Sequence, residues 1–137
     1  METITIYHNP NCGTSRNVLA LIKHLGFPTN IIYYLDTPPT EKELRNLLQK
    51  MGMTARQLLR VNVPPYTELH LDNADLTEDF LIQKMVEFPI LINRPIVISS
   101  MGVKLCRPSE TVLTILPKAL TQDFVKEDGE IIAARER

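Results

Sequence analysis

The sequence has only two cysteines, no excess of either charge and no long apolar run. With 15 basic and 16 acidic residues the net charge is −1, which gives no electrostatic reason to expect a nucleic acid as partner. No stretch approaches the apolar length that a membrane span requires. The start, M-E-T-I-T-I-Y, lacks the basic residues and the unbroken apolar segment of a signal peptide. We therefore expect a cytoplasmic protein with no membrane partner.

The two cysteines, Cys12 and Cys106, lie far apart in the sequence. A structural disulfide between them is disfavoured in the reducing compartment that the missing signal indicates. A zinc site needs three or four nitrogen or sulfur ligands, often in closely spaced pairs, and the two cysteines and three histidines show no such spacing. We expect no metal site.

The stretch Y-H-N-P-N-C-G-T-S-R, residues 7–16, connects a predicted strand to a predicted helix. Residues 3–7 alternate between polar and apolar side chains, as strands do. After the stretch, apolar residues recur at the spacing of one helix face: Val18, Leu21, Ile22 and Leu25. Thr14 and Ser15 lie where an N-cap is expected. Cys12 is therefore predicted at or just before a helix N-terminus.

The remaining pattern predicts one α/β domain over residues 1–137. Its later elements are a buried strand over 30–35, a helical insertion over approximately 40–88, strands over 95–99 and 103–106, and an amphipathic helix over 108–116. Capping signals at Thr40, Thr54 and Thr77 predict three helices inside the insertion. The charged K-E-D-G-E at 126–130 has the composition of a solvated tail. This order, β-α-β, helical insertion, β-β-α, predicts a mixed sheet and matches a thioredoxin-like fold.

Cys12 is the candidate nucleophile. Most lone cysteines are small core residues, but the polar neighbours of Cys12 and its predicted place at a helix N-terminus favour a reactive thiolate. The sequence C-G-T-S is C-x-x-S, so without a nearby resolving thiol any turnover needs an external one. Cys106, at the end of a predicted hairpin, is interpreted as a bystander.

Two neighbours of Cys12 have open roles. His8 is either a structural histidine or an imidazolium that lowers the thiol pKa. Ser15 is a helix cap, a hydrogen-bond donor to the thiolate, or both.

Three arginines suggest an oxyanion site. Arg60 follows a short predicted helix, and Arg94 and Arg107 each precede a proline, which constrains the backbone. In a thioredoxin-like fold the proline before the third strand faces the cysteine loop, which would direct Arg94 at the thiol. Guanidinium groups bind tetrahedral oxyanions in a bidentate manner. A phosphatase loop is disfavoured, because Val18 stands where that chemistry has an arginine six positions after its cysteine.

Four segments together resemble the glutaredoxin-linked arsenate reductase family: Y-H-N-P-N-C-G-T-S-R, L-L-R ending at residue 60, F-P-I-L-I-N-R-P-I-V over 88–97 and L-C-R-P-S-E over 105–110. The similarity extends over nearly the whole chain up to K-E-D-G-E. It implies that Cys12 attacks arsenate and that arsenite is released, in arsenic detoxification. It also implies two sets of assisting residues, namely His8 and Ser15 for thiolate activation and Arg60, Arg94 and Arg107 for binding the oxyanion.

The same resemblance implies glutathione as reductant co-substrate, glutaredoxin as partner and no tightly bound cofactor. Two alternatives stay open. One is a general glutathione-dependent thiol oxidoreductase of the superfamily, which the three arginines disfavour. The other is a regulator that binds RNA polymerase, which would usually carry C-x-x-C and would not need the arginines.

Overall fold

The computed structural model describes residues 1–135, which form two compact units. One unit consists of Met1–Tyr33 together with the chain from Arg94 onward, and the other is Tyr34–Asn93. The helical insertion predicted over 40–88 lies within the second unit. Across the described residues, no helix combines the length and the apolar character needed to span a bilayer.

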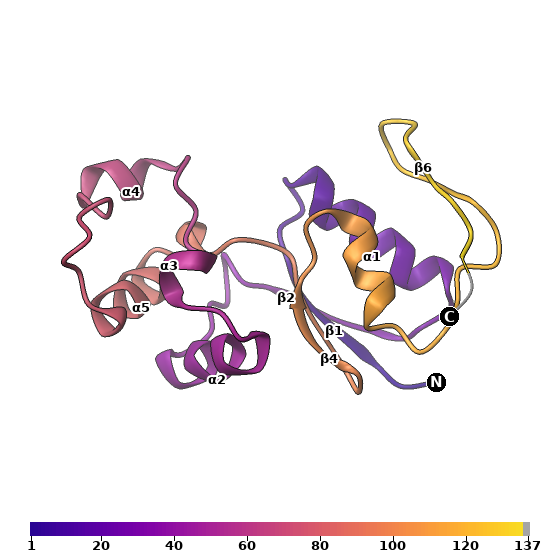
Figure 1. The fold of residues 1–137 in the computed structure, drawn as a ribbon, viewed down its shortest axis with the longest axis horizontal. Coiled ribbons are helices and arrows are strands. Elements are labelled where there is room, and N and C mark those ends of the chain that lie inside the picture. The colour runs from indigo at the N-terminus through magenta and orange to yellow at the C-terminus, as the bar shows by residue number, and fades with distance from the viewer. Residues whose placement is uncertain (136–137) are drawn as a thin grey trace. The chain divides into compact units, whose positions relative to one another are not determined.

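The first unit contains a four-stranded mixed sheet. Its strands are β1 (Ile4–His8), β2 (Thr29–Tyr33), β3 (Ile96–Ser99) and β4 (Gly102–Leu105), in the order β2-β1-β3-β4 (Figure 1). β1 is parallel to β2 and antiparallel to β3, and this confirms the predicted α/β class with a mixed sheet. The strand predicted over 30–35 is present as β2, but the expectation that it is buried is wrong, because β2 is an edge strand whose side chains are partly or largely exposed.

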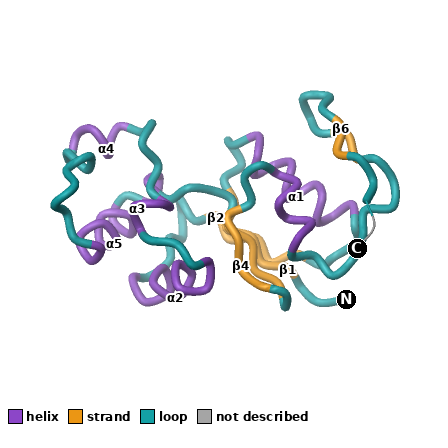
Figure 2. Tube along the Cα trace, viewed as in Figure 1, coloured by secondary structure: helices purple, strands orange, loops and turns teal. Residues whose placement is uncertain are grey.

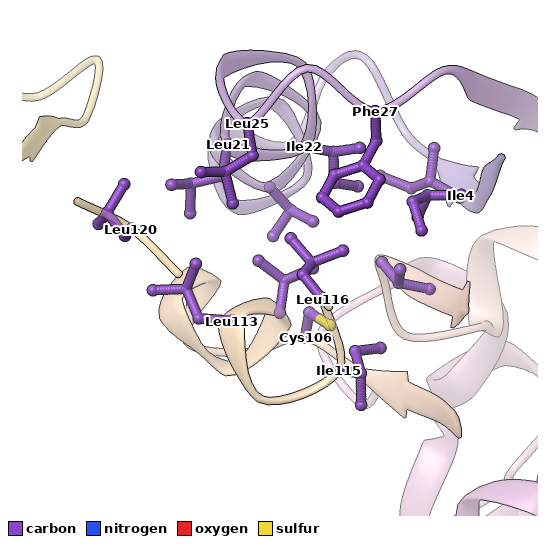
Figure 3. Packing of buried hydrophobic residues seen from close by; sticks show 14 of the residues in the cluster. Ile4, Leu21, Ile22, Leu25, Phe27, Cys106, Leu113, Ile115, Leu116 and Leu120 are labelled. Carbon is purple, nitrogen blue, oxygen red and sulfur yellow. The ribbon is translucent and has the colours of Figure 1, made fainter. Parts of the chain in front are cut away.

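Two helical segments cover this sheet and share its core. They are α1 (Gly13–His24) and the 3₁₀ helix η2 (Ser109–Thr114), which pack against each other. Figure 3 shows Leu21 and Ile22 of α1 facing Leu116 and the Cys106 side chain. The prediction of an α-helix over 108–116 is wrong, because this segment forms the 3₁₀ helix η2. The segment is bonded from residue i to residue i+3, with the Thr111 N–H donating to the Pro108 carbonyl and the Ile115 N–H to the Val112 carbonyl, both at 3.0 Å.

The register of the sheet brings three chain segments together at one end. Tyr7 pairs with Ile96, and Ile96 pairs with Leu105. Continuing both registers past the strand ends places Arg94 and Arg107 beside the loop by which β1 leads to Cys12. The peptide bonds Arg94–Pro95 and Arg107–Pro108 are both cis. The mixed sheet therefore positions the cysteine loop and two of the three candidate arginines.

The C-terminal segment is ordered and is not the solvated tail that its composition indicates. β5 (Phe124–Val125) and β6 (Ile131–Ile132) form a short antiparallel hairpin, and the rest of the segment consists of loops (Figure 2). Gly129 closes the turn with a φ of 90°, a conformation that glycine adopts without strain. The Lys126 side chain within this turn is only 8% exposed.

The second unit is helical. Its elements are α2 (Glu41–Met51), α3 (Ala55–Leu58), α4 (Pro64–Glu68), α5 (Glu78–Glu87) and the 3₁₀ helix η1 (Pro89–Leu91). The helix starts predicted at Thr40 and Thr54 are confirmed, each with a capping box, and the Thr77 hydroxyl caps α5 by accepting from the Phe80 backbone N–H. Arg60 follows α3 in this unit. Its backbone N–H donates to the Leu91 carbonyl at 2.8 Å.

Candidate active site

Cys12 is the N-cap residue of α1. Its carbonyl accepts from the Arg16 N–H at 3.0 Å, and its own N–H donates to the Asn9 carbonyl at 3.1 Å. The interpretation of Thr14 or Ser15 as the N-cap is wrong, because the helix already begins at Gly13. The placement of Cys12 at a helix N-terminus is confirmed, and its thiol lies where unpaired backbone N–H groups and the helix dipole stabilise negative charge.

A cavity of about 470 Å³ opens at Cys12, a size typical of small-molecule sites. Its lining comes entirely from the first unit and combines cations, carboxylates and the thiol: Asn11, Cys12, Gly13, Thr14, Asn17, Arg94, Arg107, Pro108, Ser109, Lys126, Glu127, Asp128 and Glu130. The Cys12 side chain itself is largely covered, at 6% exposure. A ligand in this cavity can therefore meet the thiol and two guanidinium groups together.

Arg107 contacts the thiol directly. Its Nη1 lies 3.6 Å from Cys12 Sγ and also donates to the Arg94 carbonyl at 3.1 Å. Arg94 lies close enough for its charge to act on the thiol electrostatically. The structure thus brings Arg94 and Arg107 to Cys12, as their position before the two prolines suggests.

The pKa of the Cys12 thiol lies below its ordinary value. Burial alone raises this pKa, but four stabilising contributions outweigh burial: a hydrogen bond from the Ser15 backbone N–H, the charge of Arg94, and both the hydrogen bond and the charge of Arg107. Each of these stabilises the thiolate relative to the thiol. Because the thiolate is the reactive form of cysteine, this arrangement favours a nucleophile.

The rate of Cys12 alkylation by iodoacetamide should therefore reach its half-maximum at a lower pH than for an ordinary cysteine, about 8.5. The rate follows the thiolate fraction, so it rises with pH and levels off above the pKa. We expect Arg94→Gln and Arg107→Gln each to shift the midpoint upward, because each removes a charge that stabilises the thiolate. Arg45→Gln, an exposed arginine of the second unit, should leave the midpoint unchanged. A wild-type midpoint at or above the ordinary value would contradict this description of the site.

His8 and Ser15 form a buried pair beside the cysteine loop. His8 Nδ1 lies 2.6 Å from Ser15 Oγ, and Ser15 Oγ also accepts from the Asn9 N–H at 3.1 Å. Burial, with the nearby charges of Arg16 and Lys23, lowers the pKa of His8. A lowered pKa favours the neutral ring, and His8 is not among the groups that lower the Cys12 pKa. The pair instead holds the first turn of α1, from which the Ser15 N–H reaches the thiol.

Cys106 and Arg60 do not line the Cys12 cavity. Cys106 is fully buried in the core of the first unit (Figure 3), and burial raises its pKa to about 12, so it is an unreactive thiol. Arg60 belongs to the second unit, where its Nη1 donates to the Ile90 carbonyl at 3.4 Å. Its participation in an oxyanion site stays a prediction.

Sequence reasoning missed the cavity wall that the C-terminal segment supplies. The available signal was the D-G pair between two short apolar stretches, which is typical of a hairpin turn. Within residues 1–135, no cluster of histidine, cysteine and carboxylate side chains is arranged to hold a metal ion. Both cysteines are free thiols.

Comparison with known proteins shows the family of this chain. The ArsC family model matches residues 7–115, which include all six candidate residues. The chain belongs to the ArsC family. ArsC relatives named arsenate reductase are 57% identical in Escherichia coli (strain K12), covering 95% of this chain and 92% of the relative, and 56% identical in Yersinia enterocolitica, covering 96% and 94%.

Solved ArsC structures agree with this assignment. The structure of an arsenate reductase from Vibrio cholerae is 41% identical to this chain and has a TM-score of 0.79, covering 83% of this chain and 98% of its own. The ArsC assignment confirms both the resemblance and the thioredoxin-like fold predicted from the sequence.

Proposed function

We propose that this protein is an arsenate reductase in which Cys12 is the nucleophile. The observation that carries the proposal is the thiol at the α1 N-terminus, with a lowered pKa and with a guanidinium nitrogen of Arg107 3.6 Å from its sulfur. A thiolate beside guanidinium groups suits a tetrahedral oxyanion electrophile. Relatives of this chain at 56% and 57% identity that are named arsenate reductase support arsenate as that oxyanion.

In the proposed reaction, Cys12 Sγ attacks arsenic, a sulfur–arsenic bond forms, and an arsenate oxygen leaves as water or hydroxide. Arg94 and Arg107, with Arg60 as the third arginine, bind the remaining oxygens and stabilise the charge that develops in the transition state. His8 holds Ser15, whose backbone N–H donates to the thiolate. His8 and Ser15 thus act by positioning, whereas the arginines contact the substrate.

Reduction of arsenate to arsenite requires two electrons. A glutathione thiolate attacks the Cys12 sulfur of the arsenate adduct, the sulfur–arsenic bond breaks with its electron pair left on arsenic, and Cys12 and glutathione remain joined by a disulfide. Support for an external donor comes from C-x-x-S at the site and from the burial of Cys106, the only other cysteine. We therefore propose glutathione as the reductant and glutaredoxin as the partner that resolves the resulting adduct. We further propose that the protein acts in the reducing cytoplasm and that its role there is arsenic detoxification.

A coupled assay tests this function by following NADPH consumption with glutathione, glutaredoxin and glutathione reductase present. We expect consumption that depends on arsenate and that stops when either glutathione or glutaredoxin is left out. Consumption with a low-molecular-weight disulfide but none with arsenate would instead identify a general thiol oxidoreductase.

A further inference from the structure

The turn at residues 126–130 forms one wall of the Cys12 cavity and is fixed there by specific contacts. Arg16 binds the Glu127 carboxylate through two nitrogens, at 2.9 and 2.7 Å. The Glu127 N–H donates to Asn17 Oδ1 at 3.1 Å. A Cβ at Gly13 would lie 3.0 Å from Glu127 Oε1, so the missing side chain leaves room for this carboxylate. The wall is thus held against the first turns of α1.

The charges of this wall are unfavourable for an anion site. Glu127, Asp128 and Glu130 all line the cavity, and Lys126 is the cation among them. Lys126 Nζ lies 2.9 Å from Glu110 Oε1 and 3.0 Å from Glu130 Oε1, so a single ammonium serves two carboxylates. Its hydrogen bond with Glu110 raises the pKa of Lys126, which therefore stays charged.

Lys126 also differs from an ordinary surface lysine. Its side chain is only 8% exposed, and a lysine is seldom buried to that extent unless it is paired. Closure of the hairpin does not require the ammonium, because the backbone N–H of Lys126 donates to the Glu130 carbonyl at 2.8 Å. The buried charge therefore needs an explanation other than hairpin formation.

We propose that Lys126 is a specificity-determining residue of the cavity, whose ammonium neutralises Glu110 and Glu130 so that anions can approach Cys12. This inference rests on the proposed function insofar as that function gives the cavity an anionic substrate. Without the ammonium, the negative charge of Glu130 in this wall and that of Glu110, which contacts Lys126 outside the lining, would both oppose the approach of an anion. Like charges in a partly covered site repel more strongly than in bulk water.

Two alkylating agents that differ in charge test the proposal directly. Iodoacetate is an anion and iodoacetamide is neutral, and both react with the Cys12 thiolate. The ratio of their rates is therefore independent of the thiolate fraction and reports the electrostatic potential at the sulfur. We expect Lys126→Met to lower the iodoacetate-to-iodoacetamide ratio on the order of fivefold, as for one unit charge near the path of the reagent. Lys126→Arg, which keeps the charge, should stay within about twofold of wild type.

Glu130→Gln tests the same proposal with the opposite sign. Glu130 is exposed, so its substitution should not disturb folding, and removing its charge should raise the ratio. Asp79→Asn, which removes one exposed carboxylate from an Arg45 pair in the second unit, is the matched control and should leave the ratio unchanged. If neither Lys126→Met nor Glu130→Gln changes the ratio, or if both change it in the same direction, Lys126 has only a structural role.

Steady-state kinetics separate this proposal from the function itself. We expect Lys126→Met to raise the KM for arsenate several-fold with a small effect on kcat, because the charge acts on approach and binding. A wild-type protein that does not reduce arsenate, but whose alkylation ratios respond as described, would overturn the proposed substrate while leaving the role of Lys126 supported. Wild-type arsenate reduction with unresponsive ratios would overturn the role of Lys126 alone.

Discussion

Replacing Cys12 with serine should abolish arsenate reduction, with a loss of at least about a thousandfold, the scale on which loss of an enzymatic nucleophile acts. The serine hydroxyl lacks the acidity of the thiol, so it would not form the anion that the Ser15 N–H, Arg94 and Arg107 stabilise. The coupled NADPH assay measures the loss. Thermal unfolding of the same variant should be close to wild type, because serine is a favourable N-cap residue and its hydroxyl can accept the Ser15 N–H in place of the sulfur.

Replacing Cys106 should leave most of the activity. The side chain lies among apolar residues of the core, where burial raises its pKa to about 12. Cys106→Ser buries a hydroxyl among apolar residues, with the Lys104 carbonyl that the thiol now meets at 3.6 Å as its acceptor, and should cost about 1–3 kcal/mol of stability. Cys106→Ala keeps the position apolar and separates activity from stability. If the loss of turnover in Cys106→Ala equals that in Cys12→Ser, the mechanism uses an internal dithiol and the bystander interpretation is wrong.

Arg94→Lys and Arg107→Lys should each lower kcat/KM for arsenate by roughly a hundredfold, corresponding to about 3 kcal/mol of transition-state stabilisation. Lysine keeps the positive charge but not the planar pair of donors that binds two oxygens at once. Iodoacetamide alkylation of Cys12 should change far less, because that reaction has no oxyanion to bind.

The matched control for both substitutions is Arg45→Lys, which alters an exposed arginine of the second unit. Phosphate and sulfate should compete weakly with arsenate in the wild-type protein, since both are tetrahedral oxyanions. Arg60→Lys tests the third predicted member of the arginine set. Wild-type arsenate turnover in all three active-site lysine variants would show that the oxyanion site lies elsewhere.

The central features of the site could be predicted because they depend on local sequence. Alternation before the cysteine and helical spacing after it are enough to place Cys12 at a helix N-terminus, as observed. The prolines after Arg94 and Arg107 mark where the chain enters β3 and leaves β4, and the pairing of these strands brings both arginines to the thiol. These inferences need only short-range sequence patterns and the strand order of a thioredoxin-like fold.

The features that sequence reasoning missed depend on contacts between distant residues. The pairing of Arg16 with Glu127 joins positions 111 residues apart, and no local pattern around K-E-D-G-E indicates it. The charge state of His8 depends on how deeply the ring is buried, which its neighbours in the sequence do not reveal. The apolar spacing over 108–116 does not distinguish the i→i+3 hydrogen bonds of the 3₁₀ helix η2 from those of an α-helix.

Peptide mapping by mass spectrometry tests the role of Cys12 in arsenate reduction most directly. The reduced protein is incubated with glutathione, with and without arsenate, in the absence of glutaredoxin, so that the proposed adduct accumulates. We predict a glutathione adduct on Cys12 that forms only when arsenate is present, with Cys106 unmodified. An adduct that forms equally without arsenate, or that is found on Cys106 instead, would contradict the proposal that Cys12 reacts with arsenate.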